Sequence, residues 1–300
     1  MTTAPVAPLP GRSVDQRHIT LDADGILLSA RLARPVHVPP RALIVALHGA
    51  GMSAGYFDGP AHPETSLLAI AAELGFAVVA VDRPGYGRSA DHLPYGQGVV
   101  DQSRTLAAAL RRLVEQYETG AGIFLMGHSF GCKPALQIAA DGTVPELFGL
   151  DLSGCGAEYL VSPTAPATRA GSWKLNWGPL RLYPPGTFQS SAGVVAPAPE
   201  RELADAARWP AVFAGLAERI SVPVRFTFAE HEAWWRRDHQ ALARLRDRLV
   251  AAPRVLIDDQ PDAGHNISLG WAARAYHLRA LGFAEECLRR PGAGQRETIR

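Results

Sequence analysis

The stretch that most constrains the fold is the pentad Gly127-His128-Ser129-Phe130-Gly131. It follows an apolar run of strand character, residues 121–126, and precedes residues 132–140, which have the character of a helix. Glycines on both sides of a serine allow a strand and a helix to approach each other without a Cβ clash. The pattern therefore predicts a tight strand–turn–helix unit that exposes the Ser129 hydroxyl at the end of a sheet, beside the N-terminus of the helix.

Apolar runs elsewhere in the chain indicate a mostly parallel sheet. Residues 42–47 and 76–81 are continuous apolar runs, as expected for strands that are buried on both faces. Helical stretches separate such runs, which predicts an α/β fold with helices on both faces of the sheet. Two runs around the turn 22–25 predict an N-terminal antiparallel hairpin. The expected strands are 17–21, 26–32, 42–47, 76–81, 121–126, 147–152, 222–228 and 254–257, and the expected helices are 66–74, 99–117, 132–140 and 267–288.

Composition argues against several classes of function. The chain has 300 residues, of which 47% are apolar and 20% charged, and its formal net charge of +1 gives no reason to expect nucleic acid as a partner. Cys132, Cys155 and Cys287 have the spacing of neither a disulfide framework nor a zinc site. We recognise no signal peptide, membrane span or dinucleotide fingerprint. We therefore expect a cytoplasmic protein with reduced thiols, no metal and no cofactor, and the patterns do not predict its oligomeric state.

Two loops that follow predicted strands complete a family pattern. His48-Gly49-Ala50-Gly51-Met52 follows the run 42–47, and Asp82-Arg83-Pro84-Gly85-Tyr86-Gly87-Arg88-Ser89 follows the run 76–81. Together with the pentad, these loops resemble the α/β-hydrolase family, in its serine hydrolase branch of esterases and thioesterases. The resemblance implies a twisted, mostly parallel α/β-hydrolase sheet with an inserted lid, and Ser129 as the nucleophile. The second loop is expected to be structural, with its aspartate and arginine holding the turn.

The same resemblance implies an oxyanion hole made of two backbone N–H groups. One belongs to the residue after the nucleophile, which is Phe130. The other belongs to the glycine-rich loop, where Ala50 has the matching position and Gly51 is the alternative. These groups would stabilise the negative charge that develops when the serine attacks an acyl carbonyl.

A base and an acid must accompany the serine. In the loop after the last predicted strand, His265 matches the family's base in type, order and context. After the strand at 222–228, Glu232 matches the acid, although the family more commonly has Asp there. Glu230 and Asp151 are the alternatives for the acid. The implied order of serine, acid and histidine is the one that the α/β-hydrolase fold uses.

The stretch 154–220 interrupts the alternation of strands and helices. It is rich in proline and also contains aromatic residues, among them Trp173 and Trp177. A long insertion with this aromatic content is typical of an ordered binding element, and the resemblance implies a lid at this place. We expect it to line a pocket for an apolar or aromatic acyl substrate, with Trp173, Trp177, Gly51 and His128 as candidate contacts, although His128 could instead be packing beside the turn.

The expected organisation is a single α/β unit with one insertion. Its core strands lie before and after the insertion, so the two parts of the core must fold together. The predicted divisions are a flexible N-terminus at 1–16, a hydrolase core at 17–153 and 221–288, a lid at 154–220 and a C-terminal tail at 289–300.

These residues predict a hydrolase that forms an acyl-enzyme on an ester or thioester of a small molecule. His265 would act as the general base for Ser129, and Glu232 would orient the imidazole. A serine rather than an aspartate at position 129 argues against epoxide hydrolase and haloalkane dehalogenase activity. Three alternatives stay open: an acyl transferase or cyclase, a C–C bond hydrolase, and an inactive ligand-binding protein of the same fold.

Overall fold

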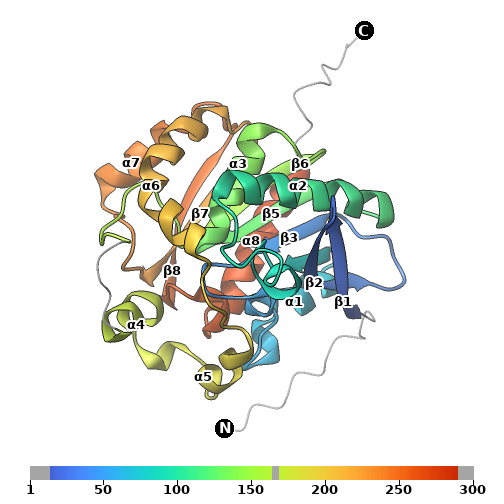
Figure 1. The fold of residues 1–300 in the computed structure, drawn as a ribbon, viewed down its shortest axis with the longest axis horizontal. Helices are drawn as coiled ribbons and strands as arrows, with labels where there is room; N and C mark the ends of the chain where they lie inside the picture. Colours follow the sequence, from blue (N-terminus) through green and yellow to red (C-terminus); the bar gives the residue numbers. More distant parts are fainter. Residues whose placement is uncertain (1–13, 164–168, 290–300) are drawn as a thin grey trace.

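The computed structural model of the chain describes residues 14–163 and 169–289, and these form a sheet covered by helices (Figure 1). The sheet has eight strands in the order β1-β2-β4-β3-β5-β6-β7-β8. The first two strands pair antiparallel with each other, and β2 pairs antiparallel with β4. All pairs from β4 to β8 are parallel. The strands are β1 Val14–Ala23, β2 Ile26–Pro35, β3 Leu43–Leu47, β4 Ala77–Val81, β5 Ile123–His128, β6 Leu147–Ser153, β7 Val224–His231 and β8 Val255–Gly264.

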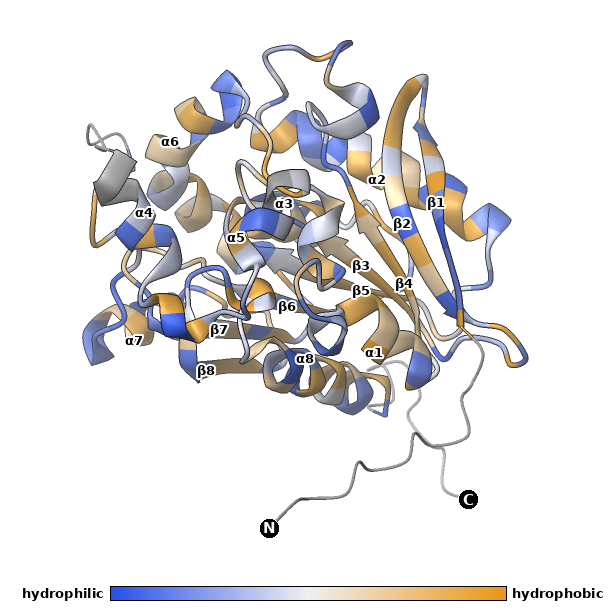
Figure 2. Cartoon of the chain, turned by 90° about the horizontal axis from the view of Figure 1, so that it is seen from below, coloured by the Kyte–Doolittle hydropathy of each residue, from blue (hydrophilic) through white to orange (hydrophobic). Residues whose placement is uncertain are grey.

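Helices cover both faces of this sheet (Figures 1 and 2). Helices α2, α3 and α6 lie on one face, and α1 and α8 lie on the other, as the two clusters of buried apolar side chains show. This is the mostly parallel α/β-hydrolase architecture that the sequence predicts, including the N-terminal antiparallel hairpin. The helices are α1 Leu67–Glu73, α2 Val99–Gln116, α3 Cys132–Asp141, α4 Arg169–Trp177, α5 Thr187–Ser190, α6 Glu200–Leu216, α7 His239–Asp247 and α8 Ala273–Leu288.

The central strands are apolar on both sides, because each side meets a different helical layer. In β3, Leu43 and Val45 pack into the cluster beneath α2 and α3, whereas Ile44 and Ala46 pack into the cluster beneath α1 and α8. Successive side chains of a strand point to opposite faces, so a strand between two layers needs apolar residues at every position. The continuous apolar runs in the sequence follow from this geometry.

The segment between β6 and β7 contains α4, α5 and α6, and its last helix packs on the side of the sheet that α3 covers. In α6, Trp209 is fully buried in the same cluster as α3, and its indole N–H donates to the carbonyl of Gly156 at 2.9 Å. Earlier in the segment, an isolated antiparallel bridge joins Val195 to Met52. The segment therefore contributes to the core and also contacts the glycine-rich loop after β3.

Several predicted boundaries need correction. Strand β1 begins at Val14, which pairs with Pro35, so residues 14–16 belong to the sheet rather than to the expected flexible N-terminus. Strand β8 continues to Gly264, well beyond the predicted end at 257. Helix α7 was not predicted, and α8 begins only at residue 273. The predictions for residues 1–13 and 290–300 lie outside the described residues.

Among residues 14–163 and 169–289, no helix is long and apolar enough to cross a membrane. The three cysteines, Cys132, Cys155 and Cys287, are buried and form no disulfide bond.

Candidate active site

The turn after β5 holds Ser129 in an uncommon backbone conformation. Its φ angle is 51°, in the left-handed region that side chains other than glycine seldom adopt. A Cβ at Gly127 would lie 2.7 Å from Cα of Cys132, and a Cβ at Gly131 would lie 2.2 Å from the carbonyl oxygen of Leu47. Both glycines are therefore required by the close approach of backbone to backbone. The turn leaves Ser129 partly exposed, although its neighbours in the pentad are buried.

Three side chains from separate strand ends meet at this turn. The Oγ atom of Ser129 lies 2.9 Å from Nε2 of His265, and Nδ1 of the same ring lies 2.8 Å from Oε2 of Glu232. Ser129 follows β5, Glu232 follows β7 and His265 follows β8. The side chain of Glu232 is fully buried and that of His265 is 4% exposed. The serine thus lies at the open end of a hydrogen-bonded line whose other two members are shielded from water.

Of the three carboxylates considered for the acid, only Glu232 has a hydrogen bond to His265 among the described residues. The exposed Glu230 accepts a hydrogen bond from the backbone N–H of Asp262 at 2.8 Å. Asp151 is buried within the sheet, where it pairs with Arg225 at 2.6 Å and accepts a hydrogen bond from the hydroxyl of a buried tyrosine of α8. These partners account for both alternatives without the imidazole.

The glycine-rich loop after β3 lies against the serine turn. A Cβ at Gly49 would lie 3.1 Å from Cβ of Ser129. Gly51 donates its N–H to the hydroxyl of Tyr86 at 3.0 Å, so this donor is already in use. The N–H of Ala50 has no hydrogen bond to any of the residues that the structure describes. Ala50 is exposed, whereas the side chain of Phe130 is buried.

His128 lies behind the line of catalytic candidates. Its ring stacks on Tyr56 with centroids 4.5 Å apart and lies 5.0 Å from the ring of His265. Nδ1 is 3.1 Å from the hydroxyl of Ser153, and burial lowers the pKa of the ring well below its ordinary value. With 1% of its surface exposed, His128 has no free face for a substrate, unlike the direct contact considered from the sequence. Its neutral ring packs beside the ring of His265.

The two tryptophans considered for substrate contact belong to one aromatic cluster. Trp173 and Trp177 stack with centroids 5.5 Å apart, and Phe188 lies 4.9 Å from each of them. Tyr183 contacts Trp177 and donates its hydroxyl to the carbonyl of that residue at 2.7 Å. Trp177 is buried, whereas Trp173 is 42% exposed. The carbonyl group of Trp177 also packs closely against Gly264, the residue before His265.

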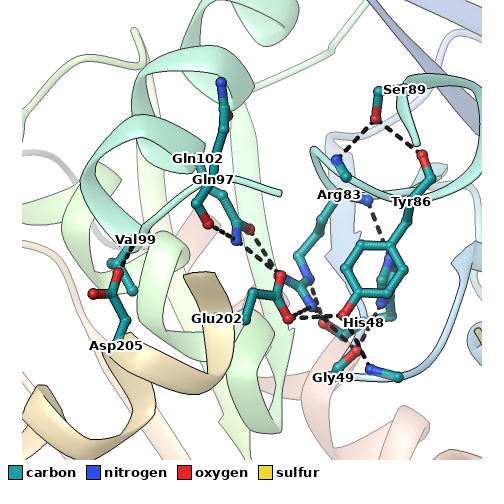
Figure 3. A network of polar contacts seen from close by, with 12 residues as sticks. His48, Gly49, Arg83, Tyr86, Ser89, Gln97, Val99, Gln102, Glu202 and Asp205 are labelled. Atoms are coloured by element: carbon teal, nitrogen blue, oxygen red, sulfur yellow. Dashed lines mark hydrogen bonds and ion pairs between the residues drawn. The ribbon is translucent and has the colours of Figure 1, made fainter. Parts of the chain in front are cut away.

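One charged residue near this site, Glu202, could not be recognised from the sequence. Glu202, in α6, is fully buried and forms an ion pair with Arg83, which lies in the loop after β4 (Figure 3). The two residues are 119 positions apart, and neither has a local pattern that points to the other. The only signal in the sequence was the arginine of the D-x-P-G-x-G-x-S loop, which was expected to hold its own turn.

The candidate site offers no ligand set for a metal. Among the described residues, no three His, Cys, Asp or Glu side chains gather in an arrangement that could hold a metal ion. A surface groove of about 270 Å³ lies at the opposite edge of the sheet, near the first residues of β3 and β4, and is not part of the site. A serine hydroxyl hydrogen-bonded to an imidazole, which is itself bonded to a carboxylate, can perform proton transfer and nucleophilic attack.

Comparisons with known proteins agree with this architecture. The peroxisomal alpha-beta-hydrolase Lpx1 from Saccharomyces cerevisiae has a similar fold, with 13% sequence identity, a TM-score of 0.64, and coverage of 97% of this chain and 94% of that chain. A highly thermostable carboxyl esterase from Bacillus coagulans is similar at 17% identity and a TM-score of 0.68, with 92% of this chain and 99% of that chain covered. E-2-(acetamidomethylene)succinate hydrolase is similar at 17% identity and a TM-score of 0.64, with 90% and 98% covered.

Sequence comparison is more decisive than these structural likenesses, which at such low identity concern the fold alone. No curated protein matches the chain in sequence. The sequence model of the alpha/beta hydrolase family, however, matches residues 44–294, which include the glycine-rich loop, the serine turn and the loop after β8. The chain therefore belongs to the alpha/beta hydrolase family.

Proposed function

We propose that the protein is a serine hydrolase that cleaves an ester or thioester of a small-molecule acyl compound. The observation that carries this proposal is the line from Ser129 through His265 to Glu232, with contacts of 2.9 and 2.8 Å. A serine hydroxyl is a weak nucleophile until a base accepts its proton, and this line supplies the base and the group that orients it. The name of the similar Bacillus coagulans esterase is in keeping with this chemistry.

In the proposed reaction, Nε2 of His265 accepts the proton of Ser129 while Oγ attacks the acyl carbonyl carbon. Glu232 accepts the hydrogen bond from Nδ1–H and stabilises the imidazolium that forms. The tetrahedral intermediate then expels the leaving alcohol or thiol, which takes the proton from His265, and the acyl group stays on Ser129. A water molecule, deprotonated by His265, releases the acid and restores the serine.

Two backbone donors are proposed for the oxyanion hole. The N–H of Phe130 stands at the start of the turn that leads into α3, where helix N-terminal N–H groups and the helix dipole favour negative charge. We assign the second donor to Ala50 rather than Gly51, because the Gly51 N–H is already bonded to Tyr86. Removal of one such donor typically costs about 3 kcal/mol of transition-state stabilisation.

The aromatic cluster is the surface that we propose for binding an apolar or aromatic acyl group of the substrate. Trp173, in this cluster, is partly exposed. Trp177 is buried, and its carbonyl group packs against Gly264, the residue before His265. We propose that residues 154–220 act as a lid with this cluster as its substrate-facing part. Trp173→Ala should then raise KM for a nitrophenyl octanoate or benzoate about tenfold, as expected for loss of a large apolar contact. KM for nitrophenyl acetate should change little.

Labelling with a fluorophosphonate tests the serine directly. The wild-type protein should be labelled covalently, and Ser129→Ala should not be labelled and should lose about 10⁶-fold in kcat. Ser268→Ala is a matched control, because Ser268 Oγ also contacts a histidine, His277, at 3.0 Å but is buried. This variant should keep the labelling.

A substrate panel separates the remaining chemistries. It contains nitrophenyl esters, acyl thioesters with and without an acceptor alcohol, and a dihydroxylated diketone. Turnover of the esters or thioesters to free acid supports hydrolysis. Turnover of the diketone alone, transfer to the acceptor alone, or an unlabelled wild-type protein would each contradict the proposed activity.

A further inference from the structure

A buried charged network connects α6 to the loops around the candidate site (Figure 3). Arg83 and Glu202 are both 0% exposed. Glu202 accepts hydrogen bonds from both terminal nitrogens of Arg83, from the amide of Gln102 at 2.8 Å and from the hydroxyl of Tyr86 at 2.7 Å. A buried charge pair is retained at low cost only when its hydrogen bonds are satisfied, as they are here. The network therefore has one well-defined arrangement.

The arginine of this network also holds the backbone of the glycine-rich loop. Its Nε donates to the carbonyl of His48 at 2.7 Å, and its Nη2 lies 3.2 Å from the carbonyl of Gly49. The Gly49 carbonyl and the Ala50 N–H belong to the same peptide group. Because a trans peptide is planar, its C=O and N–H point in opposite directions. Nδ1 of His48 also lies 2.8 Å from the Gly49 carbonyl, and the other ring nitrogen of His48 accepts the backbone N–H of Arg83 at 3.1 Å. Arg83 therefore holds the Gly49 carbonyl both directly and through His48, and with it the direction of the Ala50 N–H.

Tyr86 holds the peptide group on the other side of Ala50. Its hydroxyl accepts the Gly51 N–H at 3.0 Å and donates to Oε2 of Glu202. Burial raises the pKa of Tyr86, so its hydroxyl stays protonated and can serve as donor and acceptor together. The peptide groups before and after Ala50 are thus both tied to the Arg83–Glu202 pair.

The network also contacts the side chain of Phe130, whose N–H is the other proposed donor. The guanidinium carbon of Arg83 lies 5.0 Å from the ring centroid of Phe130, within the range of a cation–π contact. On the outer side of the loop, the Ala196 N–H donates to the Gly51 carbonyl at 2.9 Å. The loop is therefore held by α6 and by the stretch that precedes it.

We propose that Arg83, Glu202 and Tyr86 are positioning residues that hold the Ala50 N–H in place for the oxyanion. Glu202 comes from the segment between β6 and β7, so the insertion sets the geometry of the reaction centre. This inference rests on the proposed serine hydrolase function and adds an element to it.

The test uses Tyr86→Phe, which removes one hydroxyl and keeps the ring. With the best nitrophenyl ester of the panel, kcat should fall about 10²-fold while KM changes less than about threefold, as expected for a reacting group displaced by about 1 Å. The inhibition constant of an alkyl trifluoromethyl ketone, which forms a tetrahedral oxyanion adduct on serine, should rise in parallel with the loss in kcat/KM. Arg83→Lys keeps the charge but loses the forked donor and should show the same pattern.

Tyr276→Phe is the matched control, because its hydroxyl also donates to the carboxylate of a buried arginine pair, that of Asp151 with Arg225, at 2.7 Å but has no hydrogen bond to the glycine-rich loop. It should keep the wild-type kcat and ketone affinity, whatever its effect on thermal unfolding. Circular dichroism identifies the variants that fold. If Tyr86→Phe does not fold, the kinetics of Arg83→Lys test the inference in its place. A folded Tyr86→Phe protein with kcat within about twofold of wild type overturns the inference, as does an equal loss in Tyr276→Phe. A wild-type protein without turnover or labelling contradicts the proposed function instead.

Discussion

Nδ1 of His265 lies 2.8 Å from Oε2 of Glu232, although 33 positions separate the two residues. The second carboxylate oxygen, Oε1, accepts the backbone N–H of Trp234 at 3.0 Å. Both oxygens are therefore occupied, and the side chain is fully buried. This carboxylate has one orientation available, which turns the other ring nitrogen of the imidazole toward Ser129.

Glu232→Gln should retain the fold and lose about 10⁴-fold in kcat, because the amide no longer favours the tautomer that accepts the serine proton. Glu230→Gln, two residues earlier, is the control and should leave kcat within about twofold. Steady-state kinetics on a nitrophenyl ester measure both. If the loss followed Glu230 instead, the assignment of the acid would be wrong.

Gly131→Ala should lower the free energy of unfolding by about 3 kcal/mol, because its Cβ would enter the carbonyls of Leu47 and His48, which are backbone atoms and cannot move aside. Gly215→Ala, in α6, has no atom within 4 Å of the new Cβ. It should raise the stability by about 0.5–1 kcal/mol, as expected for alanine in a helix. Urea unfolding of the two variants tests this contrast, and equal effects would contradict it.

Lys133 makes the free energy of unfolding depend on pH in the alkaline range. Burial lowers its pKa from 10.5 to about 8, although its ammonium group contacts the rings of Phe130 and Trp209. Below pH 8 the folded and unfolded chains are both protonated, and the buried charge costs stability. Between pH 8 and 10.5 the folded chain gives up its proton first, so this cost disappears.

The stability of the wild-type protein relative to Lys133→Met should therefore increase by about 3 kcal/mol between pH 7 and pH 10.5. Methionine keeps most of the side-chain volume and carries no charge. Urea unfolding at a series of pH values measures the difference. A difference that stays constant over this range would show that Lys133 does not titrate as described.

His277 makes the free energy of unfolding depend on pH in the acidic range. Burial lowers its pKa from 6.5 to about 3, so below pH 6.5 the unfolded chain binds a proton that the folded chain refuses. Stability is complete above pH 6.5 and is lost as the pH falls toward 3. Between pH 7 and pH 5 the wild-type protein should lose about 2 kcal/mol more than His277→Gln. Parallel acid titrations of the two proteins would contradict this prediction.

The sheet and the serine turn could be predicted because their signals are local. A buried parallel strand must be apolar at successive positions, as in 42–47, and the serine turn needs Gly127 and Gly131, which flank Ser129 in the sequence, for close backbone contacts. The position of His265 followed from its place after the last strand. Boundaries were less well predicted, because the last pairs of β8 depend on the partner strand rather than on its own residues.

Long-range pairings could not be predicted in the same way. The carboxylates of Glu232, Glu230 and Asp151 look alike in the sequence, and only their neighbours in space separate them. The pairing of Arg83 with Glu202 joins a core loop to the insertion, and no periodicity relates the two. The burial of His128 depends on Tyr56, which comes from a different loop.

The positive φ angle of Ser129 limits which nucleophiles this turn could carry after engineering. Aspartate and asparagine adopt that backbone region more readily than other residues with a side chain, whereas a β-branched residue is a marked outlier there. Threonine, the nearest chemical relative of serine, is thus a poorer replacement than aspartate. For directed evolution on this scaffold, a switch from hydroxyl to carboxylate attack is more accessible than the exchange of a primary alcohol for a secondary one.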